Sequence, residues 1–528
     1  MMKKRILITL TAFTLITATS IITSCATQKD FVRPANYTLK TEVLTIPQGQ
    51  IQGIYNQDQT VQLFAGVPYA KPPVGDLRWK EPQDPEPWEG VFSADHFAPE
   101  AMQTHSKLVS IIWNNYYHPQ KSRTTDCPSS EDCLYLNIWK PETEKKDLPV
   151  LVYIHGGSFC NGQSFFEEID GENMAKRDII VVTIAYRVNV FGFFALQELI
   201  DESPNHTTGN YGLLDMAKAL EWVNKNISYF GGNPNNVTIA GESAGSSAVS
   251  TMCASPLTKD YFNRAIGESS SVIVENPKHS FRSLETALKM GEDIKKEFKA
   301  KNLADLRKIP AEKLVRTKFT NNSCTVDGYV LPQTPYEIYK QGLNHEEALL
   351  NGYNLHESYA WMVFTKINTK NYDQLLQTAF PKNWESVKKL YPATTNQEAK
   401  DYYTDIFTTV CFSYPHHVWT EFVSSQNKPT YMYCFTKQNR QYKDHHTGEI
   451  MYAYDNIPLD SKNHDESDFI LEKQMSTYWE NFIKTGNPNG PNLPEWKPYT
   501  ENQKQLINFD TTLKMIDDPF NNLYEFVE

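Results

Sequence analysis

The chain has 528 residues, of which 40% are hydrophobic and 22% charged, so its composition is that of a globular protein able to bury a large core. Its formal net charge of −12 at pH 7 argues against a nucleic-acid-binding surface, and we expect no nucleic-acid partner. Beyond residue 40 there is no Gly/Ser linker, repeat or low-complexity tract, which predicts one domain over residues 41–528.

The N-terminus has the pattern of an export signal. Lys3, Lys4 and Arg5 precede an apolar stretch over residues 6–22, as in secretory signal peptides. The stretch leads through Ile-Thr-Ser to Cys25, which resembles the lipobox of bacterial lipoproteins, where a signal peptidase cuts before a cysteine that carries lipid. The alternatives are an ordinary cleaved signal or an uncleaved anchor, for which seventeen residues are marginal.

We therefore expect a signal peptide over residues 1–24, and a lipidated N-terminus and polar tether over residues 25–40 with the lipid on Cys25. This predicts an exported cell-envelope lipoprotein, in the periplasm or on the cell surface, attached to a membrane through its lipid. Export implies an oxidising environment, and seven cysteines remain besides Cys25, so at least one is free or pairs outside the chain. Cys127 and Cys133 could close a small ring.

Apolar runs predict buried strands at residues 149–154, 179–185, 237–240, 348–350 and 430–435. Helical patterns lie between them, such as residues 214–227, where the apolar residues share one face. This alternation predicts an α/β fold with a mostly parallel central sheet flanked by helices. The Lys- and Glu-rich stretch 280–320 has amphipathic spacing, which predicts a helical insertion over the sheet.

Two glycines follow the first of these predicted strands, in the run His155-Gly156-Gly157-Ser158-Phe159. Glycines allow backbone N–H groups to turn into a site, so Gly156 and Gly157 are candidate oxyanion donors, together with the N–H of Ala244. Such donors stabilise the tetrahedral oxyanion of acyl transfer, and we expect neither a metal nor another cofactor. We expect His155 to hold this loop.

Residues 241–245 read Gly-Glu-Ser-Ala-Gly, a G-x-S-x-G motif with its serine at Ser243. The motif closes the predicted strand 237–240 and opens a run of small residues that suits a helix, which is the strand–turn–helix context of a nucleophile. The flanking glycines bend without a Cβ clash, and the helix N-terminus directs N–H groups at the group under attack. Ser243 is the predicted nucleophile.

A serine hydroxyl needs a base, and the base needs a carboxylate that orients it. In α/β-hydrolases these residues follow the serine in the order acid, then histidine, and Glu357 lies just after the predicted strand 348–350. The loop after the predicted strand 430–435 suits the base, although the pattern does not separate two adjacent histidines there. The base candidates are His416, His417, His445, His446 and His464. A neutral histidine base predicts that activity falls on the acid side with a pKa of about 6–7.

Longer motifs carry a more specific resemblance. They are FAGVPYA at 64–70, PPVGDLRW at 72–79, SEDCLYLN at 130–137, GNYGLLD at 209–215, YWENF at 478–482 and TGNP at 485–488. With these motifs the chain, from about residue 52 to residue 499, resembles the type-B carboxylesterase family, which includes bacterial para-nitrobenzyl esterases and the cholinesterases.

This resemblance implies an α/β-hydrolase fold with helical insertions over the active site. It implies Ser243 as nucleophile, Glu357 as triad acid and His446 as base, since the family histidine is followed by x-x-Glu. It also implies the oxyanion donors Gly156, Gly157 and Ala244, and structural ion pairs of Arg78 with Glu131 and of Arg187 with Asp215. One departure is that Met102 stands where the family has the cysteine that pairs with Cys133.

The combined prediction is a hydrolase that cleaves a small-molecule carboxylic ester through an acyl-enzyme, with water as the final acceptor. An amidase or peptidase on the same fold is one alternative. A non-catalytic binding or adhesion protein is another, because relatives of the resembled family have lost the serine or the histidine. All three triad residues are present here, which favours the enzyme.

Overall fold

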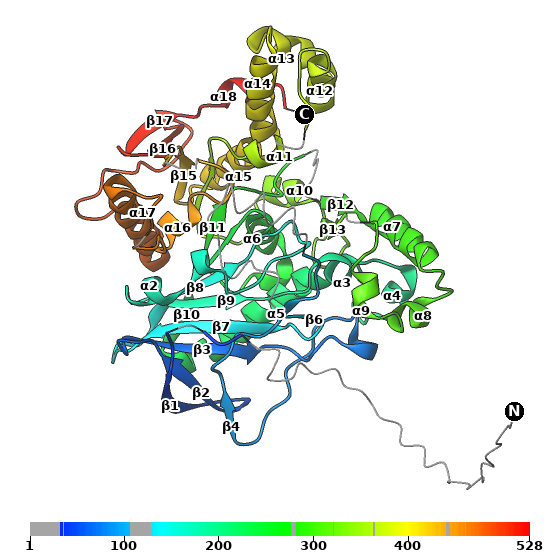
Figure 1. Cartoon of the computed structure of the whole chain (residues 1–528), viewed down its shortest axis with the longest axis vertical. Coiled ribbons are helices and arrows are strands. Elements are labelled where there is room, and N and C mark those ends of the chain that lie inside the picture. Colours follow the sequence, from blue (N-terminus) through cyan, green and yellow to red (C-terminus); the bar gives the residue numbers. More distant parts are fainter. Residues whose placement is uncertain are drawn as a thin grey trace, which may run out of the picture.

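The structure is a computed structural model and describes residues 32–34, 36–105, 128–275, 281–319, 321–362, 365–439, 444–459 and 461–527. The predicted signal peptide, Cys25 and Cys127 lie outside these residues. Within them, thirteen strands form one sheet in the order β1-β2-β3-β7-β9-β8-β10-β11-β14-β15-β16-β17, with β4 paired to β2 (Figure 1).

The large sheet comprises β1 (Leu39–Ile46), β2 (Gly49–Tyr55), β3 (Val61–Pro68), β4 (Val91–Ser93), β7 (Tyr135–Pro141), β8 (Leu148–Ile154), β9 (Ile180–Ile184), β10 (Gly232–Glu242), β11 (Arg264–Glu268), β14 (Ala348–Asn354), β15 (Thr430–Phe435), β16 (Gln505–Phe509) and β17 (Lys514–Asp517). Two small sheets pair β5 (Glu100–Ala101) with β6 (Ser129–Ser130), and β12 (Phe281–Ser283) with β13 (Cys324–Val326).

The strands from β9 to β16 in this order are parallel, and antiparallel strands complete the sheet at both edges. The five strands predicted from apolar runs are β8, β9, β10, β14 and β15. β14 extends beyond the predicted residue 350 to Asn354, because its polar side chains are paired in the interior: Thr420 Oγ1 donates to Asn351 Oδ1 over 3.0 Å. A buried amide that is hydrogen-bonded is tolerated in a central strand.

The helices are α2 (Glu172–Ala175), α3 (Asn189–Phe193), α4 (Gln197–Glu202), α5 (Tyr211–Asn226), α6 (Ala244–Ala254), α7 (Leu284–Glu297), α8 (Leu303–Arg307), α9 (Ala311–Leu314), α10 (Pro335–Lys340), α11 (Tyr359–Met362), α12 (Tyr372–Ala379), α13 (Trp384–Leu390), α14 (Asn396–Thr408), α15 (Tyr414–Ser425), α16 (Ile450–Ala453), α17 (Glu466–Thr485) and α18 (Asn521–Tyr524). A π-helical turn, η7 (Thr409–Ser413), joins α14 to α15.

Two hydrophobic cores cover the two faces of the sheet. Alternate side chains of a strand point to opposite faces, and in β8 Val150 and Val152 join one core whereas Leu151 and Tyr153 join the other. The first core includes residues of α5, α6 and α15, and the second includes residues of α2, α16 and α17. None of the helices within the described ranges has the length and apolar character needed to cross a membrane.

Two further helical segments extend the structure beyond these helices. Within the stretch 280–320, α7, α8 and α9 follow the short strand β12 and bury residues in the first core, so the predicted helical character of the stretch is confirmed. A second segment, α12–α14, was not predicted; it stands at the top of the view in Figure 1 and packs its own core with the C-terminal residues Leu523 and Phe526. Its core includes Tyr372, Leu376 and Ile406. Tyr372 and Leu376 are four residues apart and lie on the same face of α12.

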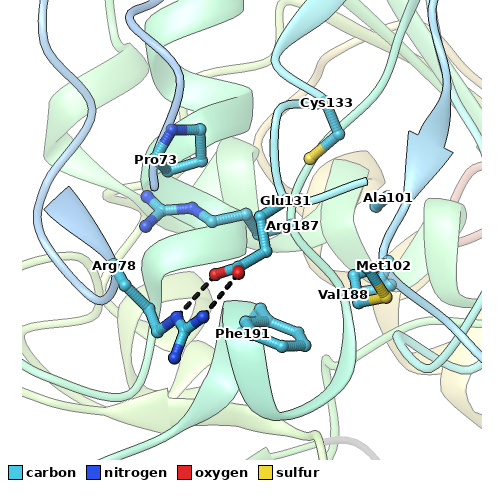
Figure 2. Close-up of a pocket in the computed structure, with 9 residues that line it drawn as sticks. All are labelled: Pro73, Arg78, Ala101, Met102, Glu131, Cys133, Arg187, Val188 and Phe191. Carbon is cyan, nitrogen blue, oxygen red and sulfur yellow. Dashed lines mark hydrogen bonds and ion pairs between the residues drawn. The ribbon is translucent and has the colours of Figure 1, made fainter. Parts of the chain in front are cut away.

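The implied ion pairs are present. Arg78 Nε donates to Glu131 Oε1 over 2.6 Å, and Arg187 Nη2 donates to the fully buried Asp215 Oδ1 over 2.7 Å. Figure 2 shows the first pair at a small cavity of about 10 Å³, which Met102 and Cys133 also line. Cys133 is a free, buried thiol. The loop that leads into β7 is therefore held by the Arg78–Glu131 ion pair and by packing.

Candidate active site

The predicted site residues follow the carboxyl ends of neighbouring parallel strands. Gly156 and Gly157 follow β8, Ser243 follows β10, Glu357 follows β14 and His446 lies in the connection after β15. In the sheet these strands run in the order β8-β10-β11-β14-β15, so all four connections leave the same edge. Open parallel sheets bind ligands in the crevice outside this edge.

Ser243 sits at a strained turn between β10 and α6. Its backbone adopts φ 57° and ψ −126°, a conformation that non-glycine residues rarely take. The Ser243 N–H donates to the carbonyl of Glu268 on β11 over 2.8 Å, which holds the turn against the sheet. A Cβ at Gly245 would lie 2.1 Å from the Ile154 carbonyl oxygen, so this position requires glycine. The predicted sharp strand–turn–helix around the serine is therefore present.

In the loop after β8, the carbonyl groups of the two glycines accept hydrogen bonds from other residues of the same loop. His155 Nδ1 donates to the Gly156 carbonyl over 2.8 Å, and the Gly157 carbonyl accepts from the N–H groups of Cys160 and Asn161 over 2.9 and 3.1 Å. Because a trans peptide points its N–H and C=O in opposite directions, the Gly157 N–H faces away from His155. Burial lowers the pKa of His155 to about 4, so its ring stays neutral in the loop.

This loop lies directly against the serine turn. A Cβ built on Gly156 would be 3.2 Å from Ser243 Cβ and 2.7 Å from the Glu242 carbonyl oxygen. Ala244 is the first residue of α6, where backbone N–H groups have no partner within the helix. The three glycine and alanine N–H groups predicted as oxyanion donors therefore belong to two segments that meet at Ser243.

Glu357 and His446 are in direct contact. His446 Nδ1 donates to Glu357 Oε2 over 2.6 Å, and both side chains are buried. Glu357 Oε1 accepts from the backbone N–H of Asn354 over 2.8 Å, which orients the carboxylate. An acidic partner on Nδ1 fixes the ring and leaves Nε2 for proton exchange.

The Nε2 atom of His446 faces a second carboxylate, Glu242 Oε1, at 3.2 Å. Burial lowers the pKa of His446, but Glu242 and Glu357 outweigh burial and raise it to about 9. This is above the range of about 6–7 expected of an ordinary histidine base. Glu242 is a residue whose influence on the base the sequence analysis missed, although it stands next to the serine in the motif.

The other candidate histidines have different surroundings. His445 stacks on Tyr359 with ring centroids 4.9 Å apart, and its carbonyl accepts from Asn354 Nδ2 over 2.6 Å. His416 Nε2 accepts from the Ser270 N–H over 2.8 Å, and burial lowers its pKa to about 3. Of the five candidates, His446 is the one whose ring is bonded to Glu357.

Two further buried carboxylates lie behind the triad residues. Glu449 accepts from Ser269 Oγ over 2.9 Å and from Asn354 Nδ2 over 2.5 Å, and burial together with Glu357 raises its pKa to about 7. Glu268 accepts from Trp479 Nε1 over 3.0 Å, and burial raises its pKa well above the usual range. Both acids are therefore hydrogen-bonded, as buried carboxylates must be.

Two aromatic rings, from α11 and from η7, lie against His446. Its ring centroid lies 5.0 Å from that of Trp361 and 5.1 Å from that of Phe412, which belongs to the π-helical turn η7. π-helical turns often occur at functional sites. Neither ring could be found from the sequence, because α11 and η7 carry no motif. Among the described residues, no group of three or more His, Cys, Asp or Glu side chains could hold a metal ion.

Comparisons with known proteins agree over most of the chain. Residues 40–527 match the model of the family described as "Carboxylesterase family". Carboxylesterase 1D of Rattus norvegicus is 31% identical over 525 residues, covering 90% of this chain and 89% of that protein. Fumonisin B1 esterase of Sphingopyxis macrogoltabida is 31% identical over 478 residues, covering 87% and 85%. Liver carboxylesterase of Sus scrofa is 31% identical over 516 residues, covering 88% of each chain.

Proposed function

Because the chain belongs to the carboxylesterase family and is a carboxylic ester hydrolase, we propose that it cleaves its substrate through an acyl-enzyme on Ser243. His446 is the general base and Glu357 the acid that orients it. Gly156, Gly157 and Ala244 donate to the oxyanion. The fold is the α/β-hydrolase fold, and the presence of Ser243, Glu357 and His446 argues against the non-catalytic alternative.

In the first half-reaction, Ser243 Oγ attacks the ester carbonyl carbon while His446 Nε2 takes the hydroxyl proton. The carbonyl π electrons move onto oxygen, and the three N–H groups stabilise that negative charge. The tetrahedral intermediate collapses, the C–O bond to the alcohol breaks, and His446 returns its proton to the leaving alkoxide. The acyl group remains on Ser243 as an ester.

In the second half-reaction, a water molecule attacks the acyl carbon and gives its proton to His446 Nε2. A second tetrahedral intermediate forms in the same oxyanion site. It expels Ser243 Oγ, which recovers the proton from His446, and the carboxylic acid leaves. Glu357 stabilises the imidazolium through its hydrogen bond to Nδ1 in both half-reactions.

The observation that supports this proposal most strongly is the meeting of four segments at one sheet edge. The strained Ser243 turn, the glycine loop against it and the 2.6 Å contact between His446 Nδ1 and Glu357 Oε2 come from β10, β8, β14 and β15. Strained backbone at a serine is unfavourable unless the surrounding structure maintains it, and it points to function.

The test is Ser243→Ala with p-nitrophenyl acetate as substrate. Turnover should fall by roughly 10⁴-fold or more, while the circular dichroism melt stays that of the wild type, since a triad acts as a unit. The wild type should show a burst of p-nitrophenol equal to the enzyme present. Labelling by an organophosphate at a serine other than Ser243, or full activity of the alanine variant, would contradict the proposal.

We also propose that Cys25 becomes the mature N-terminus and carries lipid. The support is the basic start, the apolar run and the Ile-Thr-Ser-Cys sequence before a polar segment. One acyl chain gives only marginal membrane binding, so stable anchoring requires more than one chain. In fractionated cells, wild-type protein should sediment with membranes. Cys25→Ser should lose the lipid and keep its kcat; a wild type that is fully soluble, or whose N-terminus differs from Cys25, contradicts the anchor.

A further inference from the structure

The two connections that carry Glu357 and His446 are joined by the residues that precede them. His356, which comes just before Glu357, donates its backbone N–H to the carbonyl of Asp444 over 3.1 Å. Its side-chain Nδ1 lies 2.9 Å from each carboxylate oxygen of Asp444, which is two residues before His446. The same two connections thus share a backbone hydrogen bond and a side-chain hydrogen bond.

The Asp444 carboxylate is fully buried, and Gln438 Nε2 also donates to its Oδ1 over 3.0 Å. The His356 side chain is 34% exposed, so it reaches from the surface onto a buried acid. It also acts on a second, half-buried acid: desolvation raises the pKa of Asp405 on α14 to about 6, against the lowering effect of His356. A buried carboxylate needs such hydrogen-bond partners, so breaking this contact would take one partner from Asp444 and remove a side-chain link between the two connections.

The Glu357–His446 hydrogen bond depends on the relative position of these connections. Glu357 is carried by β14 and His446 by the connection after β15, so nothing in a single element keeps the two side chains in contact. We propose that His356 and Asp444 are positioning residues, which hold the triad acid and base in register from outside the reacting groups. This inference rests on the proposed function of Glu357 and His446.

The experiment compares His356→Ala, Asp444→Ala and the double variant with the wild type, using p-nitrophenyl acetate. A displacement of about 1 Å in a catalytic group can cost about 100-fold, so kcat should fall by about 10- to 100-fold in each single variant. KM should stay within about twofold, because neither side chain is placed on the substrate. The kcat of the double variant should be no lower than that of the less active single variant, because each single substitution already removes the same interaction.

Two further variants separate positioning from general loss of structure. His356→Gln keeps a side-chain N–H for Asp444 and should recover most of the kcat. His96→Ala is the matched control: His96 Nδ1 pairs with Asp95 Oδ1 over 2.7 Å, but these residues adjoin β4, far along the sheet from the triad strands. Its kcat should equal that of the wild type. If Asp444→Ala does not fold, the His356 variants carry the test.

A spectroscopic readout follows the proposed effect directly. The deshielded proton between His446 Nδ1 and Glu357 should shift or broaden in the NMR spectrum of His356→Ala and stay unchanged in His96→Ala. A wild-type kcat and an unchanged proton signal in His356→Ala would overturn the positioning role. Failure of the proposed function itself is distinguished by Ser243→Ala, which would then remain active.

Discussion

Replacing Glu242 by glutamine should move the acid limb of the pH–activity profile to lower pH. The Glu242 carboxylate lies 3.2 Å from His446 Nε2, and its charge stabilises the imidazolium. Glutamine has nearly the same shape and no charge, so the variant removes the attraction with little change in packing. The base must be neutral to accept the serine proton, and kcat/KM therefore rises with pH through the pKa of His446.

The size of the effect follows from the contributions to this pKa. Burial lowers the pKa of His446, and the charge of Glu242 is the largest single effect that raises it, to about 9, ahead of the charge of Glu357 and of its hydrogen bond. An opposite charge within about 4–6 Å moves a pKa by about 1–3 pH units. Glu242→Gln should therefore lower the midpoint of the acid limb by about two pH units, from about 9 toward about 7.

The assay is kcat/KM for p-nitrophenyl acetate between about pH 5 and about pH 10 at constant ionic strength, with each variant normalised to its own plateau. Glu449→Gln is the matched control, because Glu449 is the smallest of the carboxylate contributors and should shift the midpoint less. An acid limb that stays in place, or moves to higher pH, in Glu242→Gln would refute the assignment of this charge to the base.

Three other changes test the site and its support. His446→Ala should cost roughly 10⁴-fold in kcat, whereas His445→Ala should keep most activity; a dead His445 variant would reverse the assignment. Gly245→Ala should prevent the serine turn from forming, because its Cβ would meet the Ile154 carbonyl at 2.1 Å, and normal labelling by an organophosphate would contradict this. Arg187→Met should lower the free energy of urea unfolding by about 3–5 kcal/mol, since Asp215 would be left buried and unpaired.

Much of the α/β-hydrolase fold could be predicted from the sequence, because the central strands are parallel and buried on both faces. Such strands are apolar throughout, and β8, β9 and β15 stand out for that reason. The segment α12–α14 could not be predicted in this way. Its short helices bury their apolar residues against one another and the C-terminus, away from the sheet, so no strand marks its position.

The site was predictable to the extent that local pattern determines it. The turn at Ser243 needs glycines at fixed positions, and these are visible in the sequence. Local pattern left the choice between His445 and His446 open, and only the family resemblance selected His446, because the choice depends on which ring faces Glu357 between the connections after β14 and β15. The raised pKa of His446 was missed for the same reason, since it results from charges that folding brings together.

The cysteines within the described ranges indicate that the stability of the fold does not depend on redox conditions. Within the described ranges, Cys133, Cys160, Cys253, Cys324 and Cys434 are free thiols, and burial raises the pKa of Cys133, Cys253 and Cys434 well above the usual range. Thiolates are the species that attack disulfides, so these groups are poor partners in thiol exchange. Cys133 does not form a disulfide that would fix its loop. It packs in the first core and lines the small cavity beside Met102. The catalytic domain should therefore reach the same folded state in dithiothreitol as in air.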